Sequence, residues 1–458
     1  MELVRRDPFG VRPLYFAETP AGVVWSQSIW DLLERSGVPR ALEPSAVAAF
    51  LCGVLGSEAS LFRGIRRVPP GHALSVEDGR PRLRRHWMAP EPASAAVISL
   101  TREQAGAELL RRLRASVGQW RLPSACAQSG GLDSGVLLAL MAEVAPRPLA
   151  VTQADDFTDG DELAGAHRLA EHCGAALEVL TIREEDLPDH LEATVLACQE
   201  PIWNGRAVAR HLFFRAARRA GVTALLSGVG ADETLWGNPP ALLDLPERAE
   251  AERAIAETVL TPEARGSLPA ERSNTERIPE EVLARSRQVV LSHVLPDSTL
   301  PPECRTASAE GIAVHLPYLS DAVAAFALGL PLSWQIAGVT GKRLLREAAR
   351  GLVPEEIRRA PKRPRLAPSG GRGTRARARW HDLYAAWLTK ARLAPLEVID
   401  PGRVRRLLGR HRIAPASDDE GRDALLLRLV SMAILRGLDR NGRITPAGPE
   451  PNAHLTDA

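Results

Sequence analysis

The sequence predicts an α/β protein built on a doubly wound parallel sheet and preceded by a smaller α+β domain. From residue 100 onward, short apolar runs alternate with helical segments, a pattern typical of a parallel sheet with helices on both faces. Two of these runs end in glycine turns, at 129–134 and 227–230. The first 87 residues instead show closely spaced strands and turns. A proline- and alanine-rich linker follows at 88–99.

The elements of the first domain follow from alternating apolar residues bounded by turn residues. Asp78-Gly79 marks a hairpin turn between its last two strands. We predict strands at 13–16, 22–26, 72–76 and 82–87, and helices at 29–35 and 44–52.

The second domain, residues 100–458, opens with Thr101 as the predicted cap of a helix and Gln104 as its capping-box partner. Strands are predicted at 124–127, 148–152, 177–181 and 223–226, and helices at 134–144, 161–172 and 207–220. Further helices are predicted near 251–260, from 341, and at 383–388, 404–408 and 424–435. The ligand is expected at the carboxyl ends of the strands.

Composition narrows the class of protein. Of 458 residues, 45% are hydrophobic and 25% charged, which are globular values, and the net charge of +2 favours no charged partner. No apolar run approaches the ~18 residues of a membrane span, and the start lacks an apolar signal segment, so a cytoplasmic protein without a membrane partner is expected. The five cysteines form no C-x-x-C pair, which favours reduced core residues over a zinc site or disulfides.

Residues 125–139, ACAQSGGLDSGVLLA, predict a strand, a tight turn and a helix that together bind an anion. Gly130 and Gly131 allow close backbone approach. Ser129, Ser134 and the free N–H groups at the helix start would face the anion, where the helix dipole favours negative charge. The spacing matches neither the P-loop nor the G-x-G-x-x-G dinucleotide motif.

The segment SGGLDS, which includes Leu132 and Asp133, resembles the pyrophosphate-binding loop of ATP pyrophosphatases, which adenylate a substrate with ATP. The segment LSGVGADE at 226–233 resembles the LSGEGADE motif of asparagine synthetases, members of the same superfamily. This resemblance implies a sheet of the adenine nucleotide alpha-hydrolase type. It also implies that Asp133 and Asp232 hold Mg²⁺ against the ATP phosphates, for which carboxylates are suitable ligands. Ser227, Gly228 and Gly230 would complete the nucleotide site.

Only three of the 58 basic residues are lysines, so a lysine suggests a need for a compact charge that Arg cannot meet. Lys342 lies at the start of a predicted helix. Lys362 ends the segment LVPEEIRRAPK at 352–362, which also resembles the superfamily. There, a lysine at the last position stabilises charge developing during adenylation or amide formation. Lys362 and Lys342 are therefore candidate catalytic residues, and for each the alternative is an ordinary surface charge.

The first domain carries a second resemblance. RDPFGVRPLYF at 6–16 and FRGIRRVPPGH at 62–72 resemble the glutaminase (Ntn-type) domain of asparagine synthetases. In that family the nucleophile is a cysteine at the mature N-terminus, far upstream of the first segment. Here Met1 nearly adjoins that segment and no cysteine precedes Cys52, so we do not expect glutamine hydrolysis by this chain. A mis-assigned gene start, completion by another chain and a structural remnant all stay open.

Two departures from the asparagine synthetase pattern bear on the reaction. Val229 replaces the glutamate of LSGEGADE, a candidate for acid/base work on the amine, and valine cannot transfer a proton. The segment VHLPYL at 314–319 and its flanks differ from the family block, which has Glu at the position of Ala313, Arg at that of His315 and Asp at that of Ser320. Asp321, one residue later, is a possible replacement for that Asp. This segment more closely resembles the lasso-peptide cyclases of actinobacteria.

The resemblance therefore favours ATP- and Mg²⁺-dependent closure of an isopeptide bond, from an Asp or Glu side chain to the N-terminal amine of a precursor peptide. The expected partners are that peptide, a leader-recognition protein and a leader protease. The alternatives are an asparagine synthetase or related small-molecule amide synthetase, a tRNA-modifying ATP pyrophosphatase, and a non-catalytic scaffold. The arginine-rich run 358–379 is interpreted as a mobile solvated loop, and a nucleic-acid partner is disfavoured.

Overall fold

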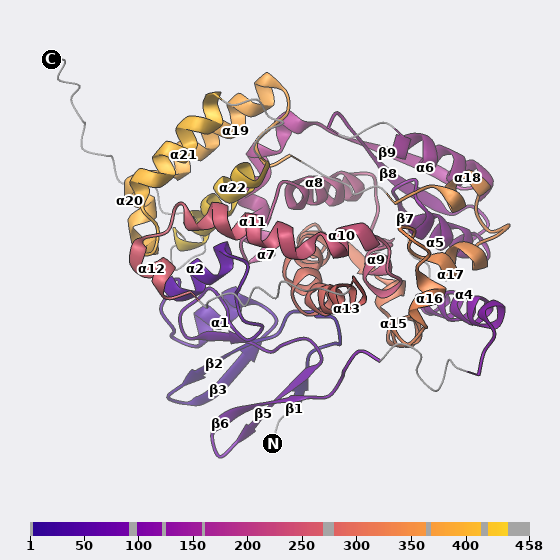
Figure 1. The fold of residues 1–458 in the computed structure, drawn as a ribbon, viewed down its shortest axis with the longest axis horizontal. Helices are drawn as coiled ribbons and strands as arrows, with labels where there is room; N and C mark the ends of the chain where they lie inside the picture. Colours follow the sequence, from indigo (N-terminus) through magenta and orange to yellow (C-terminus); the bar gives the residue numbers. More distant parts are fainter. Residues whose placement is uncertain are drawn as a thin grey trace.

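The computed structural model describes residues 3–90, 99–120, 125–157, 161–268, 279–362, 368–413 and 420–437. The N-terminal region holds two three-stranded antiparallel sheets, with strand orders β1-β5-β6 and β3-β2-β4 (Figure 1). Asp78 and Gly79 both have positive φ and form the tight turn between β5 and β6, as the Asp-Gly pair predicts. The elements are β1 (Leu3–Arg5), β2 (Tyr15–Thr19), β3 (Gly22–Ser26), α1 (Ile29–Arg35), α2 (Pro44–Leu51), β4 (Ile65–Arg67), β5 (His72–Glu77) and β6 (Arg80–Arg85).

The second region is built on a five-stranded parallel sheet in the order β11-β10-β7-β8-β9. The chain runs outward from β7 to β8 and β9, then returns to the other side of β7 for β10 and β11. The predicted doubly wound sheet is thereby confirmed, and its direction reverses between β7 and β10. The strands are β7 (Ala125–Gln128), β8 (Leu149–Asp155), β9 (Ala176–Ile182), β10 (Ala224–Leu226) and β11 (Ala313–His315).

Helices cover both faces of this sheet. α4 (Arg102–Gln119) begins with the predicted capping box, in which Thr101 Oγ1 accepts from the Gln104 amide at 3.2 Å and Gln104 Oε1 accepts from the Thr101 amide at 2.8 Å. α5 (Leu132–Ala142) is apolar on nearly all sides because it lies in the core. The connecting helices that follow are α6 (Asp161–His172), α7 (Leu191–Cys198), α8 (Arg206–Arg219) and α9 (Ala231–Thr234).

Apart from β11, the described residues that follow α9 form mainly helices and the loops between them. The π-helical turns η3 (Val290–Thr299) and η4 (Pro301–Arg305) prolong α13 toward the sheet. The helices are α10 (Pro239–Leu243), α11 (Leu245–Glu257), α12 (Pro262–Gly266), α13 (Pro279–Val289), α14 (Thr306–Ala309), α15 (Asp321–Leu328), α16 (Leu332–Gln335), α17 (Arg343–Ala348), α18 (Glu355–Arg359), α19 (Thr374–Trp387), α20 (Lys390–Leu393), α21 (Pro401–Ile413) and α22 (Glu420–Arg436).

One hydrophobic cluster joins the N-terminal region to the C-terminal helices. Side chains of α1 and α2 belong to the same buried cluster as those of α19 and α22. Phe50 of α2 stacks against Trp203, which precedes α8, with ring centroids 4.5 Å apart. The two regions therefore share one core. Most of the predicted linker, namely 91–98, lies outside the described residues.

The arginine-rich run departs from its prediction. Residues 374–379 belong to α19, and Arg358, predicted to be solvated, is only 8% exposed. Arg377 lies 3.1 Å from Asp423, and Arg379 lies 2.5 Å from Asp189. The interpretation as a solvated loop is wrong for Arg377 and Arg379, because they bind acids of distant segments, whereas Arg359 and Arg375 are 73% and 82% exposed. Residues 363–367 of the run lie outside the described residues.

Two expectations from composition can be compared with the structure. All five cysteines are free, and Cys52, Cys126 and Cys198 are buried in the core, as expected. Within the described ranges, no helix combines the length and the apolar character that a bilayer span requires.

Candidate active site

The two glycine motifs meet where the sheet reverses direction. The loop 129–134 follows β7, and the loop 227–230 follows β10, its neighbour in the sheet. Gly228 packs so closely on the first loop that an added Cβ would lie 3.4 Å from the Cβ of Asp133. Ligands of doubly wound sheets bind at such a switch point, so the structure places both motifs where a nucleotide is expected.

The first loop is held in a conformation that only glycine permits. Gly130 has φ +73°, and an added Cβ would lie 2.2 Å from the carbonyl oxygen of Glu162. Ser134 Oγ accepts from the Ser129 amide at 3.2 Å and lies 3.1 Å from Ser129 Oγ. The first amides of a helix have no intrahelical acceptor, and Gly131, which caps α5, offers them no side-chain acceptor. They form an anion site at a helix N-terminus.

Leu132, Gly230 and Ser227 support the two loops through burial or backbone geometry. Leu132 is 7% exposed and packs in the core, so its side chain anchors the start of α5. Gly230 has φ +96° and an added Cβ would meet Leu319 at 2.3 Å, so glycine is required for the turn into α9. Ser227 is buried and its amide donates to the His315 carbonyl at 2.9 Å.

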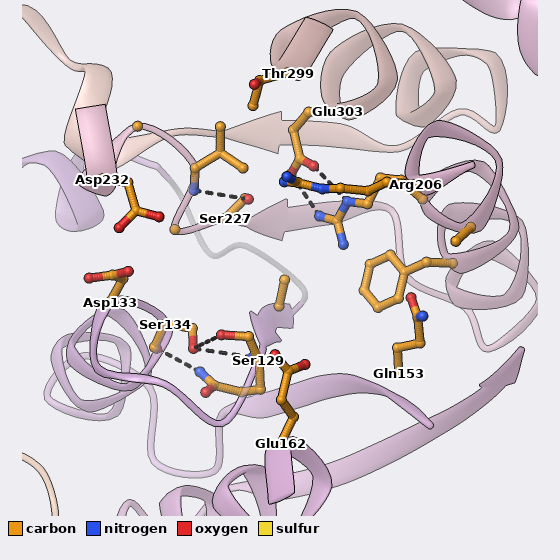
Figure 2. A pocket seen from close by; sticks show the side chains of 18 of the residues that line it. Ser129, Asp133, Ser134, Gln153, Glu162, Arg206, Ser227, Asp232, Thr299 and Glu303 are labelled. Carbon is orange, nitrogen blue, oxygen red and sulfur yellow. Dashed lines mark hydrogen bonds and ion pairs between the residues drawn. The ribbon is translucent and has the colours of Figure 1, made fainter. Parts of the chain in front are cut away.

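Both predicted carboxylates and both predicted lysines come together at the head of these loops. Lys342 Nζ lies 2.5 Å from Asp133 Oδ2 and 2.5 Å from Asp232 Oδ1. Lys362 Nζ lies 3.0 Å from Asp232 Oδ2 and 3.8 Å from Asp133 Oδ2. We call these four residues the cleft cluster. Figure 2 shows Asp133 and Asp232 facing each other on one side of the pocket.

The two lysines differ in burial. The side chain of Lys342 is only 2% exposed, whereas that of Lys362 is 35% exposed and lines the pocket. Lys342 itself has φ +58° at the start of α17, and Gly237 leaves space for its Cε and for Asp232. Lys342 is thus a fixed counter-charge, while Lys362 can reach a ligand. Their catalytic roles stay predictions.

The cluster shifts the protonation equilibria of its members. Burial alone would raise the pKa of Asp232, but Lys342 and Lys362 hold it well below the usual value for an aspartate. Burial alone would lower the pKa of Lys362, but Asp232 and Asp133 raise it above the usual value for a lysine. At neutral pH, Asp232 is therefore anionic and Lys362 cationic. The neighbouring Glu233, by contrast, has a pKa raised by burial and by Asp232.

The cluster also suits a divalent cation. Asp133 Oδ1 is buried and accepts no hydrogen bond from the described residues. Such an oxygen is costly to bury unpaired, and a hard cation would satisfy it. Mg²⁺ in proteins commonly binds through one or two carboxylates together with substrate phosphates. Asp133 and Asp232 beside an anion loop fit this description.

The cleft has a volume of about 210 Å³, and its far wall comes from residues that sequence reasoning did not select. Arg210 of α8 binds Glu303 of η4 through two contacts of 2.6 and 2.7 Å. Its guanidinium also lies 4.3 Å from the ring centre of Phe213. Figure 2 shows Glu303 and Arg206 across the pocket from Asp133 and Asp232.

The charge of Glu303 is fixed by its partners. Burial alone would raise its pKa, but Arg210 and the Ser227 hydroxyl lower it. The residue lies in the stretch 238–308, where the sequence suggested no chemistry. No motif marks the pair, because its partners are far apart in the chain and meet only in the folded protein. Arg210 and Glu303 are identified as site residues by their place in the wall of the cleft.

The segment VHLPYL supports the site from outside the cleft, because none of its residues is among those that line the cleft. Tyr318 donates from its hydroxyl to the Asp133 carbonyl at 3.1 Å. His315 stacks on Trp120 with ring centroids 5.0 Å apart, and its Nε2 lies 3.0 Å from the Ser116 carbonyl. Asp321, a suggested replacement for a family aspartate, is exposed and absent from the lining of the cleft. That suggestion stays a prediction.

Comparisons with known proteins agree with this arrangement. The family model of asparagine synthase matches residues 108–435, and that of the glutamine amidotransferase domain matches residues 1–87. Members of the asparagine synthetase family use ATP, typically with Mg²⁺.

Individual relatives are distant. A candidate glutamine-hydrolysing asparagine synthetase of Mycobacterium tuberculosis is 24% identical, over 78% of this chain and 63% of its own length. Glutamine-hydrolysing asparagine synthetase 3 of Bacillus subtilis is 22% identical, over 78% of this chain and 64% of its own. The amidase chyE of Penicillium rubens is 22% identical, over 53% and 38%. The chain thus spans less than two thirds of the length of these relatives. Because the first family model covers most of the chain and its motifs form one cleft, this protein belongs to the asparagine synthase family.

Proposed function

We propose that the chain forms an amide bond from a carboxylate and an amine, with ATP, through an acyl-adenylate. The cleft cluster carries this proposal: two carboxylates and two lysines converge on an anion loop at the switch point. An anion loop alone would suit any phosphate compound. The addition of metal-binding carboxylates and a partly exposed cation suits cleavage between the α- and β-phosphates, where negative charge develops.

Each residue of the site has a distinct task in this reaction. When bound, ATP with Mg²⁺ supplies the adenylyl group that turns a carboxylate into a good electrophile. The amides at the start of α5 and the hydroxyls of Ser129 and Ser134 bind phosphate oxygens. Asp133 and Asp232 hold the cation, and Lys342 keeps the two carboxylates in place. Lys362, protonated because of its raised pKa, supplies positive charge in the transition state.

Within this class, we propose that the substrate is a peptide that is closed into a ring. Val229 supports the proposal, because it lines the cleft where asparagine synthetases carry a glutamate and it cannot accept a proton from ammonium. The N-terminal α-amine of a peptide has a pKa near 8 and is partly neutral at physiological pH. It therefore needs less help from a base than ammonium does. The resemblance of the V-H-x-P-Y-L segment to lasso-peptide cyclases also supports the proposal of a peptide substrate.

Cyclisation would proceed by attack of the α-amine on an adenylated Asp or Glu side chain of the same peptide. The C–N bond forms as AMP leaves, and the amine proton passes to solvent or phosphate. The attack is intramolecular, and holding the two groups together makes a large contribution to the rate. A leader-recognition protein and a leader protease are the partners proposed with this substrate, because an α-amine must be liberated before it can react.

The experiment is to incubate the purified chain with ATP, Mg²⁺ and candidate precursor peptides whose leader has been removed. Loss of one water from the peptide, detected by mass spectrometry with stoichiometric AMP, is the expected result. Peptides in which the acceptor Asp or Glu is changed to Asn or Gln are the matched control and should stay linear. AMP release driven by free aspartate and ammonia, with no change in peptide mass, would overturn the peptide proposal.

An asparagine synthetase is the second candidate, favoured by the names of two relatives. The Val229→Glu variant separates the two. If the chain acts on ammonia, the added carboxylate should raise asparagine formation, because it restores a proton acceptor beside the cleft. If the chain acts on a peptide amine, the variant should yield no asparagine and should cyclise peptides more slowly.

A further inference from the structure

A second hollow lies away from the cleft, among the helices near the C-terminal end of the described chain. α11, α12, α21 and α22 surround it, on the side of the molecule opposite α5 and α6 (Figure 1). Its volume is about 600 Å³, and it shares no lining residue with the cleft. The lining consists of Ala254, Ile255, Thr258, Arg265, Arg403, Arg406, Leu407, Arg410 and Arg422. We call it the arginine hollow, because five of these nine residues are arginines and none is acidic.

Three of the arginines form a line along one helix. Arg403, Arg406 and Arg410 are three and four residues apart on α21, so they lie on one face, with Leu407 between them. Like charges at these spacings destabilise a helix by roughly 0.2–0.5 kcal/mol per pair. Helix stability alone would therefore disfavour this arrangement.

Among the described residues, several arginines of the hollow are not paired with a carboxylate. Arg403 has a carboxylate partner in Asp400, at 3.3 Å. In the part of the chain that the structure describes, no ion pair involves Arg265, Arg406 or Arg410. The Nε of Arg265 is buried and donates to none of the described acceptors. A buried guanidinium nitrogen without an acceptor is costly, and an anion in the hollow would remove that cost.

We propose that the arginine hollow binds an acidic segment of a peptide through its Asp or Glu carboxylates. Arg403 and Arg410 lie seven residues apart, about 10 Å along the axis of α21. This separation matches carboxylates about three residues apart on an extended peptide. Ile255 and Leu407 would pack against the apolar parts of such a segment. Clusters of arginines are a common means of recognising acidic motifs.

A nucleic acid is the competing ligand, and the lining argues against it. Proteins that bind single strands combine basic side chains with aromatic ones on which bases stack. The residues that line the hollow include no Phe, Tyr or Trp. This inference does not depend on the reaction proposed for the cleft, because binding can be measured without ATP.

The test is fluorescence anisotropy with the full chain and a labelled twelve-residue peptide that carries Glu at every third position and Ala or Leu between. The same peptide with Gln for Glu, and a twelve-nucleotide single-stranded DNA, serve as comparison probes. Arg406→Glu/Arg410→Glu should weaken binding of the acidic peptide at least tenfold. Arg85→Glu/Arg405→Glu changes the net charge equally, at exposed positions on β6 and on the other face of α21, and should bind as the wild type does. Thermal melts of both variants check that the fold is retained.

Binding that is lost in the first variant and kept in the second supports the inference. Three outcomes would overturn it: no binding of the acidic peptide by the wild type, equal weakening by both variants, or tighter binding of the DNA than of the peptide. Because no substrate turnover is measured, failure here would leave the reaction proposed for the cleft unaffected.

Discussion

Two clusters of buried charge in this protein differ in kind. Between the N-terminal region and η3, Arg67 lies 2.8 Å from Asp297 and 3.6 Å from Glu200, and the Tyr15 hydroxyl donates to Glu200 at 2.9 Å. We call this the interface cluster. Its main cation is an arginine whose side chain is 5% exposed. The cleft cluster instead pairs its carboxylates with two lysines, one of which is partly exposed in the cleft.

The difference distinguishes charged residues that stabilise the fold from charged residues that would contact a ligand. A guanidinium is planar, permanently charged and able to bind several acceptors in a fixed geometry, which suits a cross-link between regions. An ammonium is a compact charge on a flexible stem, which suits a partner that arrives and leaves. Only three lysines occur in the sequence, and two of them lie in the cleft. The four predictions below test this division.

Lys342→Met should have the largest effect. It leaves Asp133 and Asp232 without their buried counter-charge, and breaking a buried ion pair costs about 3–5 kcal/mol. Urea denaturation should show this loss, and ATP–pyrophosphate exchange should fall to background. Added Mg²⁺ should restore part of the stability. Lys390→Met, at the exposed third lysine, is the control, and equal stability of the two variants would refute the assigned role.

Lys362→Ala should act on rate more than on stability. Its ammonium is partly exposed and reaches the cleft, so its loss should lower ATP–pyrophosphate exchange by about 10² to 10³, the usual range for one preorganised charge donor. The melting temperature should fall less than in Lys342→Met, because Lys362 is the more exposed of the two lysines. Normal turnover by this variant would remove Lys362 from the reaction, and Lys390→Ala provides the matched comparison.

Glu200→Gln should act on stability alone. The amide keeps a hydrogen-bond acceptor for Tyr15 but loses the charge that faces Arg67, so a loss of roughly 1.5–3 kcal/mol is expected in denaturant titrations. Under conditions in which the variant is folded, its rate of ATP–pyrophosphate exchange should equal that of the wild type. A reduced rate in folded protein would contradict the division between the two clusters.

The smallest expected effect is on the pH dependence of the melting temperature. Asp232 has a folded-state pKa below its unfolded value near 3.9, so its contribution to stability is present above that value and is lost as the pH falls through the folded-state pKa. Lys362 has a raised pKa, so its contribution is lost only at strongly basic pH. The difference in melting temperature between wild type and Asp232→Asn should stay constant from pH 7 to about 5. It should shrink below about pH 4, and a difference that grows there would oppose this sign.

Much of the fold was predictable because its signals are local. The glycine turns that follow two apolar runs predicted the ends of β7 and β10. The regular alternation of strand-like and helical segments predicted the doubly wound sheet. The strands β1, β4 and β11 were missed because each has three residues, too few for a period to be recognised. The π-helical turns of η3 and η4 contain prolines that in sequence resemble helix breaks.

The site was predictable where motifs mark it and not where folding alone assembles it. Asp133, Asp232 and Lys362 belong to segments with a recognisable pattern. Arg210 and Glu303 belong to none, because their pairing depends on how α8 packs against η4. The arginines of α19 were misjudged for the same reason, since their acidic partners lie far away in the sequence.

The shared core of the N-terminal region has a consequence for how this chain can change. Phe50 and the other side chains of α1 and α2 fill space that the C-terminal helices would otherwise leave open to water. Removing residues 1–87 would expose that apolar face and favour aggregation. The N-terminal region therefore covers an apolar surface of the parallel-sheet region, whether or not glutamine is ever hydrolysed. The parallel-sheet region thus depends on the N-terminal region for part of its hydrophobic core.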